Sequence, residues 1–210
     1  MTKAWIFDFD GTLVHSEAVI TKCFQRITKK LAPHRLDVAK KVLIGPPLRY
    51  TVAEILGDPD HPLIDEFVST FIQMHDDDVL HHTMPYATAD KTLSSLHQRG
   101  HKMAIATNKR LAPTIKILQH LHWDQFFLFV ECSDSEAVMR DKHQMIKTIT
   151  EKNSDFEGSY FIGDTVGDGL SANSNNMPFI KASYGYGQAQ DWSSVTISQT
   201  INGIDELLKL

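Results

Sequence analysis

The sequence predicts an α/β fold, in which a parallel sheet carries helices on both faces and an all-helical segment is inserted near its start. Short apolar runs bounded by turn or polar residues alternate with helix-length stretches, a pattern typical of parallel sheets. From residue 15 to 82, apolar residues instead recur at helical spacing without a convincing strand. A chain of 210 residues, 42% of them hydrophobic, is long enough to bury a core of its own.

The first predicted strand is the run AWIFDF, residues 4–9. Four further runs of this kind are expected to be buried strands of the same sheet: KMAIAT (102–107), FFLFVE (126–131), SYFIG (159–163) and PFIKAS (178–183). Helical spacing predicts helices near 87–99, 111–121, 141–152, 168–176 and 203–209. Strands and helices therefore alternate through most of the chain.

The helical insertion contains one clear break, in the stretch VLIGPPLRYTVAEIL. Gly45 suits the end of one helix, and Pro46 or Pro47 suits the first turn of the next. We therefore expect two units, an α/β core formed by residues 1–14 and 83–210 and a helical unit formed by residues 15–82.

Composition excludes several classes of protein. The net charge of −5, without a basic stripe, disfavours a nucleic-acid polymer as partner. No run approaches the ~18 apolar residues of a membrane span, and the N-terminus does not read as a secretory signal, so we expect a cytoplasmic protein. Cys23 and Cys132 lie in unrelated contexts and predict neither a disulfide nor a cysteine metal site. The oligomeric state stays open.

The segment DFDGT places Asp8 and Asp10 one residue apart at the end of the first predicted strand. Residues i and i+2 of a strand point to the same side, and open α/β sheets bind ligands at the carboxyl ends of their strands. Two carboxylates that lie close together raise one another's proton affinity or recruit a cation. The alternative is a turn or a helix cap, because Asp-Gly is a common turn signal.

Polar residues also follow the later strands. Thr107 and Asn108 offer a hydroxyl and an amide that can donate to phosphate oxygens, although such residues are also common caps and turns. Asp164 follows the strand at 159–163, and Asp168 lies at the start of a helix, where a carboxylate also suits the helix dipole. Lys142 opens the preceding predicted helix and, taken alone, is an ordinary surface lysine.

Taken together and in this order, DFDGT, ATNK, DKHQMI and GDTVGD resemble the four motifs of the haloacid dehalogenase superfamily of phosphotransferases. The insertion resembles the small helical cap of that superfamily, and IGPPL and the YGYG at 184–187 are similar to its phosphoglycolate-phosphatase-like group. The resemblance implies a Rossmann-like core. It also implies a Mg²⁺-dependent phosphatase that hydrolyses a small phosphorylated metabolite, with phosphoglycolate the leading candidate.

The resemblance gives roles to single residues. Asp8 becomes the nucleophile that forms an aspartyl-phosphate, and Asp10 becomes the general acid and base. Thr107, Asn108 and Lys142 match positions that hold the phosphoryl oxygens, and Lys142 also screens the repulsion between nucleophile and substrate.

The resemblance also implies a metal site. Asp8, Asp164 and the main-chain carbonyl of Asp10 would bind Mg²⁺, which prefers oxygen ligands. Asp168 is expected to contact these ligands without touching the ion, or else to bind the ion directly or through a water molecule. Charge supports the same conclusion, because a pocket of carboxylates repels a phosphate dianion unless a divalent cation and a lysine offset it.

Three features depart from the motifs or lie outside them. His15 stands where many relatives have an acidic residue, and we expect a structural or gating residue at the hinge into the insertion. Arg49 could pair with a substrate carboxylate or be a solvated surface residue. The aspartates at 76–78 and the histidines at 81–82 are expected to form a solvated helix end, not a second metal site.

Three alternative functions compete with this prediction. Dehalogenases of the same superfamily lack the second aspartate, whereas Asp10 is present. A sugar-phosphate mutase of the β-phosphoglucomutase type remains open, although Thr12 is more typical of the phosphatases. A non-catalytic phosphate-sensing module would be expected to have lost a catalytic group, whereas Asp8, Asp10, Lys142 and Asp164 are all present.

Overall fold

The central feature of the fold is a six-stranded sheet, all of whose strands run parallel, in the order β5-β4-β1-β6-β7-β8. The structure is a computed structural model and describes residues 3–210. The predicted α/β fold class is confirmed. The strands are β1 (Ala4–Phe7), β4 (Lys102–Thr107), β5 (Phe129–Cys132), β6 (Tyr160–Gly163), β7 (Phe179–Ala182) and β8 (Gln199–Ile201).

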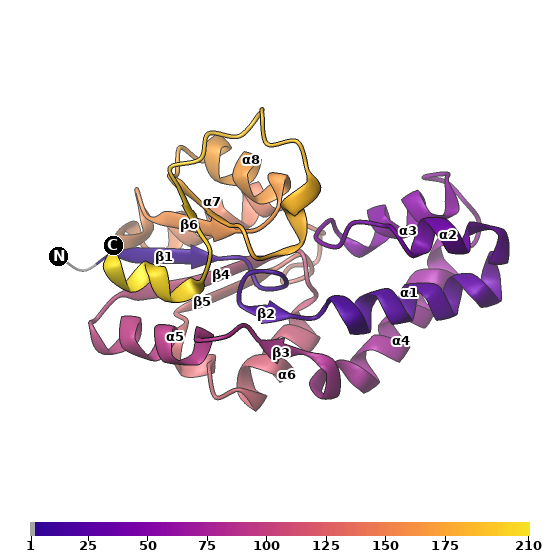
Figure 1. Cartoon of the computed structure of the whole chain (residues 1–210), viewed down its shortest axis with the longest axis horizontal. Coiled ribbons are helices and arrows are strands. Elements are labelled where there is room, and N and C mark those ends of the chain that lie inside the picture. Colours follow the sequence, from indigo (N-terminus) through magenta and orange to yellow (C-terminus); the bar gives the residue numbers. More distant parts are fainter. Residues whose placement is uncertain (1–2) are drawn as a thin grey trace.

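Helices cover both faces of the sheet (Figure 1). In β1, Trp5 and Phe7 point to one face and Ala4 and Ile6 to the other, as the two-residue period of a strand requires. Helices α5 (Ala89–Gln98) and α6 (Leu111–His120) pack on the first face, and α7 (Lys142–Lys152) and α8 (Val166–Ser174) pack on the second. Burial on both faces explains why the strands read as continuous apolar runs.

The insertion contains four α-helices and packs around a hydrophobic cluster of its own, centred on Phe24, Phe67 and Phe71. The α-helices are α1 (Glu17–Leu31), α2 (Leu36–Ala39), α3 (Leu48–Leu56) and α4 (Ile64–His82), with a 3₁₀ turn, η1, at Pro33–Arg35. In Figure 1 these helices lie beyond the end of the sheet toward which the β1 arrow points. The insertion therefore faces the carboxyl ends of the strands.

A short antiparallel ribbon connects the insertion to the core. Strand β2 (Val14–His15) pairs with β3 (Met84–Pro85), so the two chain segments that cross between the units run side by side. The exposed His15 lies in this ribbon, with its ring 5.7 Å from that of Tyr86 and 6.0 Å from that of Tyr186. The helical part of the insertion therefore begins after residue 15, at Glu17.

Several element boundaries differ from the sequence-based prediction. Strand β8 was not predicted, because its three residues Gln199–Ile201 are short and partly polar. The strand predicted at 126–131 is β5, which begins only at Phe129, because a 3₁₀ turn, η2, occupies Asp124–Phe126. The last predicted helix is the 3₁₀ helix η5 (Ile204–Lys209), and two further 3₁₀ turns are η3 (Ser154–Phe156) and η4 (Tyr186–Ala189).

The predicted helix end at Gly45 is wrong. Helix α2 already ends at Ala39, and Gly45 lies in the following loop with a φ of 133°. A Cβ at this position would lie 3.0 Å from the methyl group of Thr165, so a larger residue would crowd the core. Pro47 is the N-cap of α3 and does not lie in its first turn. Within residues 3–210, no helix is long and apolar enough to cross a membrane.

Candidate active site

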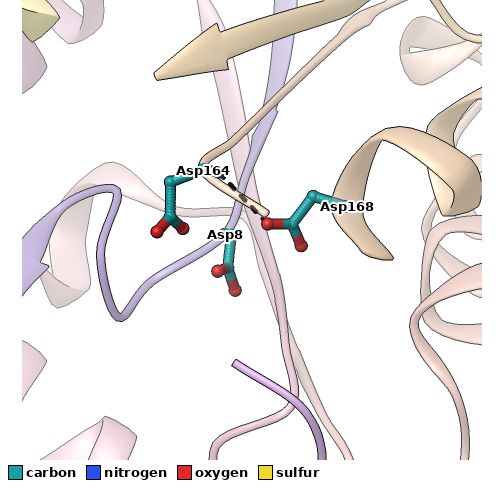
Figure 2. Close-up of side chains that lie close together, drawn as sticks. All are labelled: Asp8, Asp164 and Asp168. Atoms are coloured by element: carbon teal, nitrogen blue, oxygen red, sulfur yellow. Dashed lines mark hydrogen bonds between the residues drawn. The ribbon is translucent and has the colours of Figure 1, made fainter. Parts of the chain in front are cut away.

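Three buried carboxylates meet at the carboxyl edge of the sheet. Asp8 directly follows β1, Asp164 directly follows β6, and Asp168 lies in the first turn of α8 (Figure 2). One oxygen of each lies within 4.8 Å of one oxygen of the others. The backbone N–H of Asp8 donates to the carbonyl of Ile162 at 2.8 Å and holds Asp8 at this edge. The structure thus brings together two aspartates that the sequence placed at strand ends, Asp8 and Asp164, and one that it placed at a helix start, Asp168.

Two glycines make room for Asp164. Gly11 has a φ of 85°, and a Cβ there would lie 2.3 Å from Oδ2 of Asp164. A Cβ on Gly185 would lie 2.2 Å from Cβ of Asp164. The carboxylate accepts hydrogen bonds from the backbone N–H of Tyr186 at 2.6 Å and from the hydroxyl of Thr12 at 3.2 Å. Backbone therefore approaches Asp164 so closely that only glycine fits beside it.

The buried Lys142 is the cation of this cluster. Its Nζ lies 2.7 Å from Oδ1 of Asp8 and also contacts Oδ1 of Asp168. Lys142 is the first residue of α7, whose start is held by a capping box between Asp141 and Gln144. Burial would lower the pKa of Lys142, but the carboxylates of Asp168 and Asp8 raise it above its ordinary value. The ammonium group is therefore charged at neutral pH.

Both oxygens of Asp168 are already occupied by hydrogen bonds. Oδ1 accepts from Lys142, and Oδ2 accepts from the backbone N–H of Asp164 at 3.1 Å, shown as the dashed line in Figure 2. The N–H and hydroxyl of Thr165 also donate to Oδ2, at 2.9 and 2.7 Å. Asp168 thus accepts four hydrogen bonds, which orient Lys142 and the loop after β6. Asp164 accepts only one at each oxygen, so it and Asp8 keep more lone pairs for a cation.

The charge of the cluster fits a divalent cation. Burial raises the pKa of Asp8 to about 7 even though Lys142 opposes the shift. Burial, Asp168 and Asp8 together raise the pKa of Asp164 well above its ordinary value. A single lysine faces three carboxylates here, so ionising all three would leave excess negative charge, which a divalent cation would offset. The donors of the cluster are all hard oxygen atoms, which match the ligand preference of Mg²⁺.

Asp10 lies beside this cluster but has different partners. Strand β1 ends at Phe7, so Asp10 is positioned by the turn that follows it and not by strand alternation. Its carboxylate accepts from the Ser16 hydroxyl at 2.5 Å and from Nζ of Lys109 at 3.1 Å. The backbone N–H of Ser16 in turn donates to the hydroxyl of Tyr186 at 2.8 Å. The sequence predicts no role for Ser16, Lys109 or Tyr186, although Lys109 lies in ATNK and Tyr186 lies in YGYG.

Thr107 and Asn108 lie where β4 ends, close to the insertion. The Thr107 hydroxyl accepts from the backbone N–H of Lys109 at 3.2 Å. Nδ2 of Asn108 donates to the carbonyl of Gly45 at 2.8 Å, so this predicted phosphate-binding amide also contacts the insertion loop. Oδ1 of Asn108 is buried and has no hydrogen-bond partner among residues 3–210.

A cavity of about 80 Å³ separates the sheet edge from the insertion. Asp8, Asp10 and Thr107 line its core side together with three polar or charged residues, Asn108, Lys109 and Arg110. The insertion contributes mainly apolar side chains, namely Ile20, Phe24, Ile44, Leu48 and Phe71, and the polar Thr51 and His75. The insertion side of the cavity is therefore largely apolar, whereas its core side is polar and charged.

Arg49 does not reach this cavity. Its side chain is 58% exposed and lies 2.6 Å from the carboxylate of Asp65 on the surface of the insertion. Leu48 and Thr51, three residues apart in α3, face the cavity, and Arg49 lies on another side of the helix. The contact between Arg49 and a substrate carboxylate, which the sequence left open, is not supported by this structure.

Asp76 is not the solvated residue that the sequence predicted. Both of its oxygens contact Nη2 of Arg110, at 2.5 and 2.6 Å, and Oδ1 lies 3.4 Å from Nδ1 of the buried His75. Asp77, His81 and His82 are exposed, as expected. His75 lies one helical turn after Phe71 and is buried against it. The run of acidic residues that follows His75 favours a solvated helix end and gives no sign of this burial.

His75 is expected to make stability depend on pH. Burial, followed by the nearby Lys109, lowers its pKa from 6.5 to about 4, so the ring is neutral at pH 7 and its contact with Asp76 is no ion pair. Between these values the unfolded chain binds a proton that the folded chain does not. The stabilisation is therefore full above about pH 6.5 and falls as the pH drops toward 4.

From about pH 7.5 to about pH 5, this group should lower the free energy of unfolding by about 2 kcal/mol. Urea unfolding of the wild type and of His75→Gln at both pH values checks the prediction, because the variant lacks this titration. An identical pH dependence in the two proteins would contradict it.

Comparison with known proteins places the chain in a family. Residues 5–182 match the model of the haloacid dehalogenase-like hydrolases. A phosphoglycolate phosphatase from Agrobacterium fabrum is 29% identical over 188 residues, covering 86% of this chain and 80% of that protein. A pyrophosphatase from Halalkalibacterium halodurans is 27% identical over 168 residues, covering 78% and 75%.

A crystal structure of a protein described as a predicted phosphatase, from Clostridium acetobutylicum, superimposes with a TM-score of 0.84 at 25% identity. The match covers 100% of this chain and 97% of that one. Both the family model and the fold thus extend over most of the chain. The chain belongs to the haloacid dehalogenase-like hydrolase family.

Proposed function

We propose that the protein is a Mg²⁺-dependent phosphatase that hydrolyses a small phosphomonoester, with phosphoglycolate the first candidate. The family model together with the phosphatase names of the relatives supports an enzyme, a phosphoric monoester hydrolase. The observation that carries the proposal is the buried cluster of Asp8, Asp164 and Asp168 around Lys142 at the carboxyl ends of the strands. The name of the Agrobacterium fabrum relative supports phosphoglycolate as candidate.

Asp8 is the nucleophile in this proposal. One of its oxygens attacks the phosphorus atom, the bond from phosphorus to the leaving-group oxygen breaks, and an aspartyl-phosphate forms. Lys142, 2.7 Å from Asp8, offsets the repulsion between the carboxylate and the incoming phosphoryl group. Thr107 and Asn108, which line the same cavity, hold phosphoryl oxygens.

Asp10 moves the protons. It donates a proton to the departing alkoxide and later takes one from the water that attacks the aspartyl-phosphate. Its position beside Asp8 in the cavity wall suits both steps. The Ser16 hydroxyl and Lys109 hold the carboxylate between the core and the ribbon to the insertion.

Asp8, Asp164 and the main-chain carbonyl of Asp10 would hold the Mg²⁺ ion. When bound, the ion supplies positive charge against the phosphoryl oxygens and the surrounding carboxylates. Asp168 stays behind these residues, because its carboxylate accepts four hydrogen bonds, from Lys142, Thr165 and the backbone of Asp164, whereas that of Asp164 accepts two.

We also infer a division of labour between residues 1–14 and 83–210, which carry the chemistry, and residues 15–82, which act as a cap. The helical insertion has its own hydrophobic cluster and joins the core through the β2–β3 ribbon, which suits a hinge. Its apolar residues over the cavity would exclude bulk water from the leaving-group side when the cap is closed.

Turnover is expected to require Mg²⁺. After treatment with a chelator, the protein would be tested on phosphoglycolate, sugar phosphates, nucleotides and pyrophosphate with and without Mg²⁺. The variant Asp164→Asn removes one proposed ligand of the ion, and Asp65→Asn, at an exposed aspartate, is its matched control. We expect turnover of a small ester only with Mg²⁺, loss of it in Asp164→Asn, and inhibition by Ca²⁺ through its larger coordination sphere. Undiminished activity after exhaustive chelation would refute the metal requirement.

A further inference from the structure

We propose that Arg110 is a specificity-determining residue that selects substrates whose leaving group carries a negative charge, a carboxylate above all. This inference rests on the proposed phosphatase function and concerns the leaving-group side of the same cavity. Arg110 is the N-cap residue of α6 and directly follows Lys109, whose Nζ lies 3.1 Å from Asp10. Arg110 lines the cavity that also contains Asp8 and Asp10.

The guanidinium group of Arg110 is held at one nitrogen only. Both oxygens of Asp76 contact Nη2, at 2.5 and 2.6 Å. Within residues 3–210, no hydrogen-bond acceptor contacts Nε or Nη1, although a guanidinium offers five N–H donors. The side chain is only 23% exposed. Asp76 therefore fixes a cation at the cavity wall while donors are left over for a ligand.

The other two cations near the cavity are committed to the catalytic carboxylates. Nζ of Lys109 contacts both oxygens of Asp10, and Nζ of Lys142 contacts Asp8 and Asp168. His75 is neutral at pH 7 because burial lowers its pKa to about 4. Among the residues that line the cavity, Arg110 is thus the cation that does not pair with a catalytic carboxylate, and Nε and Nη1 of its guanidinium offer donors to a leaving group.

The apolar cap surface makes this charge selective. Phe24, Phe71 and Ile20 line the cavity opposite the core, so a ligand that fills it displaces water, and attraction between opposite charges is then weakly screened. An anionic leaving group would satisfy the remaining guanidinium donors, whereas a neutral one would leave them unpaired. In phosphoglycolate the carboxylate carbon lies two bonds from the ester oxygen, which suits a cavity of about 80 Å³.

The test compares phosphoglycolate with 2-hydroxyethyl phosphate, a neutral ester of nearly equal size, in the presence of Mg²⁺. Arg110→Met should reduce kcat/KM for phosphoglycolate at least about tenfold more than for the neutral ester, mainly through KM. Arg110→Lys keeps the charge without the planar fork and should lose part of the preference. Arg49→Met, which removes an exposed arginine of the insertion, should leave the preference of the wild type unchanged.

Asp76→Asn separates charge recognition from a structural role. If Arg110 served only to join α6 to α4 through Asp76, then Asp76→Asn and Arg110→Met would alter both esters alike. We expect Asp76→Asn to keep the preference for phosphoglycolate, because the arginine remains, and circular dichroism would establish that each variant is folded.

Equal losses on the two esters in Arg110→Met, or a wild-type preference for the neutral ester, would overturn this inference and leave the proposed phosphatase function standing. Lack of Mg²⁺-dependent turnover with every ester would overturn both.

Discussion

Asp8→Asn is expected to lower phosphatase turnover by about 10⁴-fold or more, because the amide keeps the shape of the side chain but cannot act as nucleophile. The fold should survive. Lys142, 2.7 Å from Oδ1 of Asp8, can donate to an amide oxygen as it does to the carboxylate. The substitution also removes a buried carboxyl group whose ionised form burial disfavours, as its raised pKa indicates. Turnover of phosphoglycolate and p-nitrophenyl phosphate with saturating Mg²⁺ measures the loss, and thermal unfolding followed by circular dichroism measures the stability.

Asp65→Asn is the matched control for this substitution, since Asp65 lies on the surface of the insertion and pairs only with the exposed Arg49 among residues 3–210. It should retain wild-type turnover. If Asp8→Asn retained comparable turnover, Asp8 would not be the nucleophile and the proposed aspartyl-phosphate route would fail.

Asp10→Asn is expected to lower turnover by about 10²- to 10⁴-fold, and by an amount that depends on the leaving group. An alkoxide is a poor leaving group that needs a proton as it departs, whereas p-nitrophenolate needs little protonation. The loss should therefore be larger for phosphoglycolate than for p-nitrophenyl phosphate. The Asn oxygen in the place of Oδ1 can still accept from the Ser16 hydroxyl and from Nζ of Lys109, which both contact Oδ1 of Asp10, whereas the second contact of Lys109, with Oδ2, is lost.

The measurement is the ratio of kcat for the two esters in the wild type and in Asp10→Asn. A burst of p-nitrophenol in the variant would show that formation of the aspartyl-phosphate outpaces its hydrolysis, in which Asp10 also acts. If both substrates lost the same factor at the step that expels the leaving group, the acid role of Asp10 would be rejected.

The positions of Asp8 and Asp164 could be predicted from sequence because each directly follows a buried strand. Parallel strands in one sheet end at a common edge, so a local apolar run followed by a carboxylate locates the residue in space. Phe7 pairs in register with Ile162, which places the residues after β1 and β6 next to each other. The role of Lys142 could not be predicted from its local sequence, because a lysine at a helix start is usually a surface residue. Only the order of the four motifs indicated that role.

Long-range contacts set what the sequence could not determine. Strand β8 joins the sheet through pairing with β7, although its own three residues carry little strand signal. The hydrogen bonds that Asp168 accepts from Lys142 and from the loop after β6 likewise depend on how α7, α8 and the end of β6 meet. Local pattern contains no information on which oxygen accepts from which donor.

The α/β core, its helical insertion and the carboxylate edge could be predicted from the residues alone, because apolar periodicity and strand ends are local properties. In contrast, the packing of the folded chain sets the position of Arg110 at the cavity, that of Arg49 away from it, and the contact of Asp76 that joins the insertion to the core. This is because the rotation of a helix about its axis, and its docking on another unit, follow from the packing of its buried face. A charged residue at the border of that face turns toward solvent or toward a partner according to where the neighbouring unit lies.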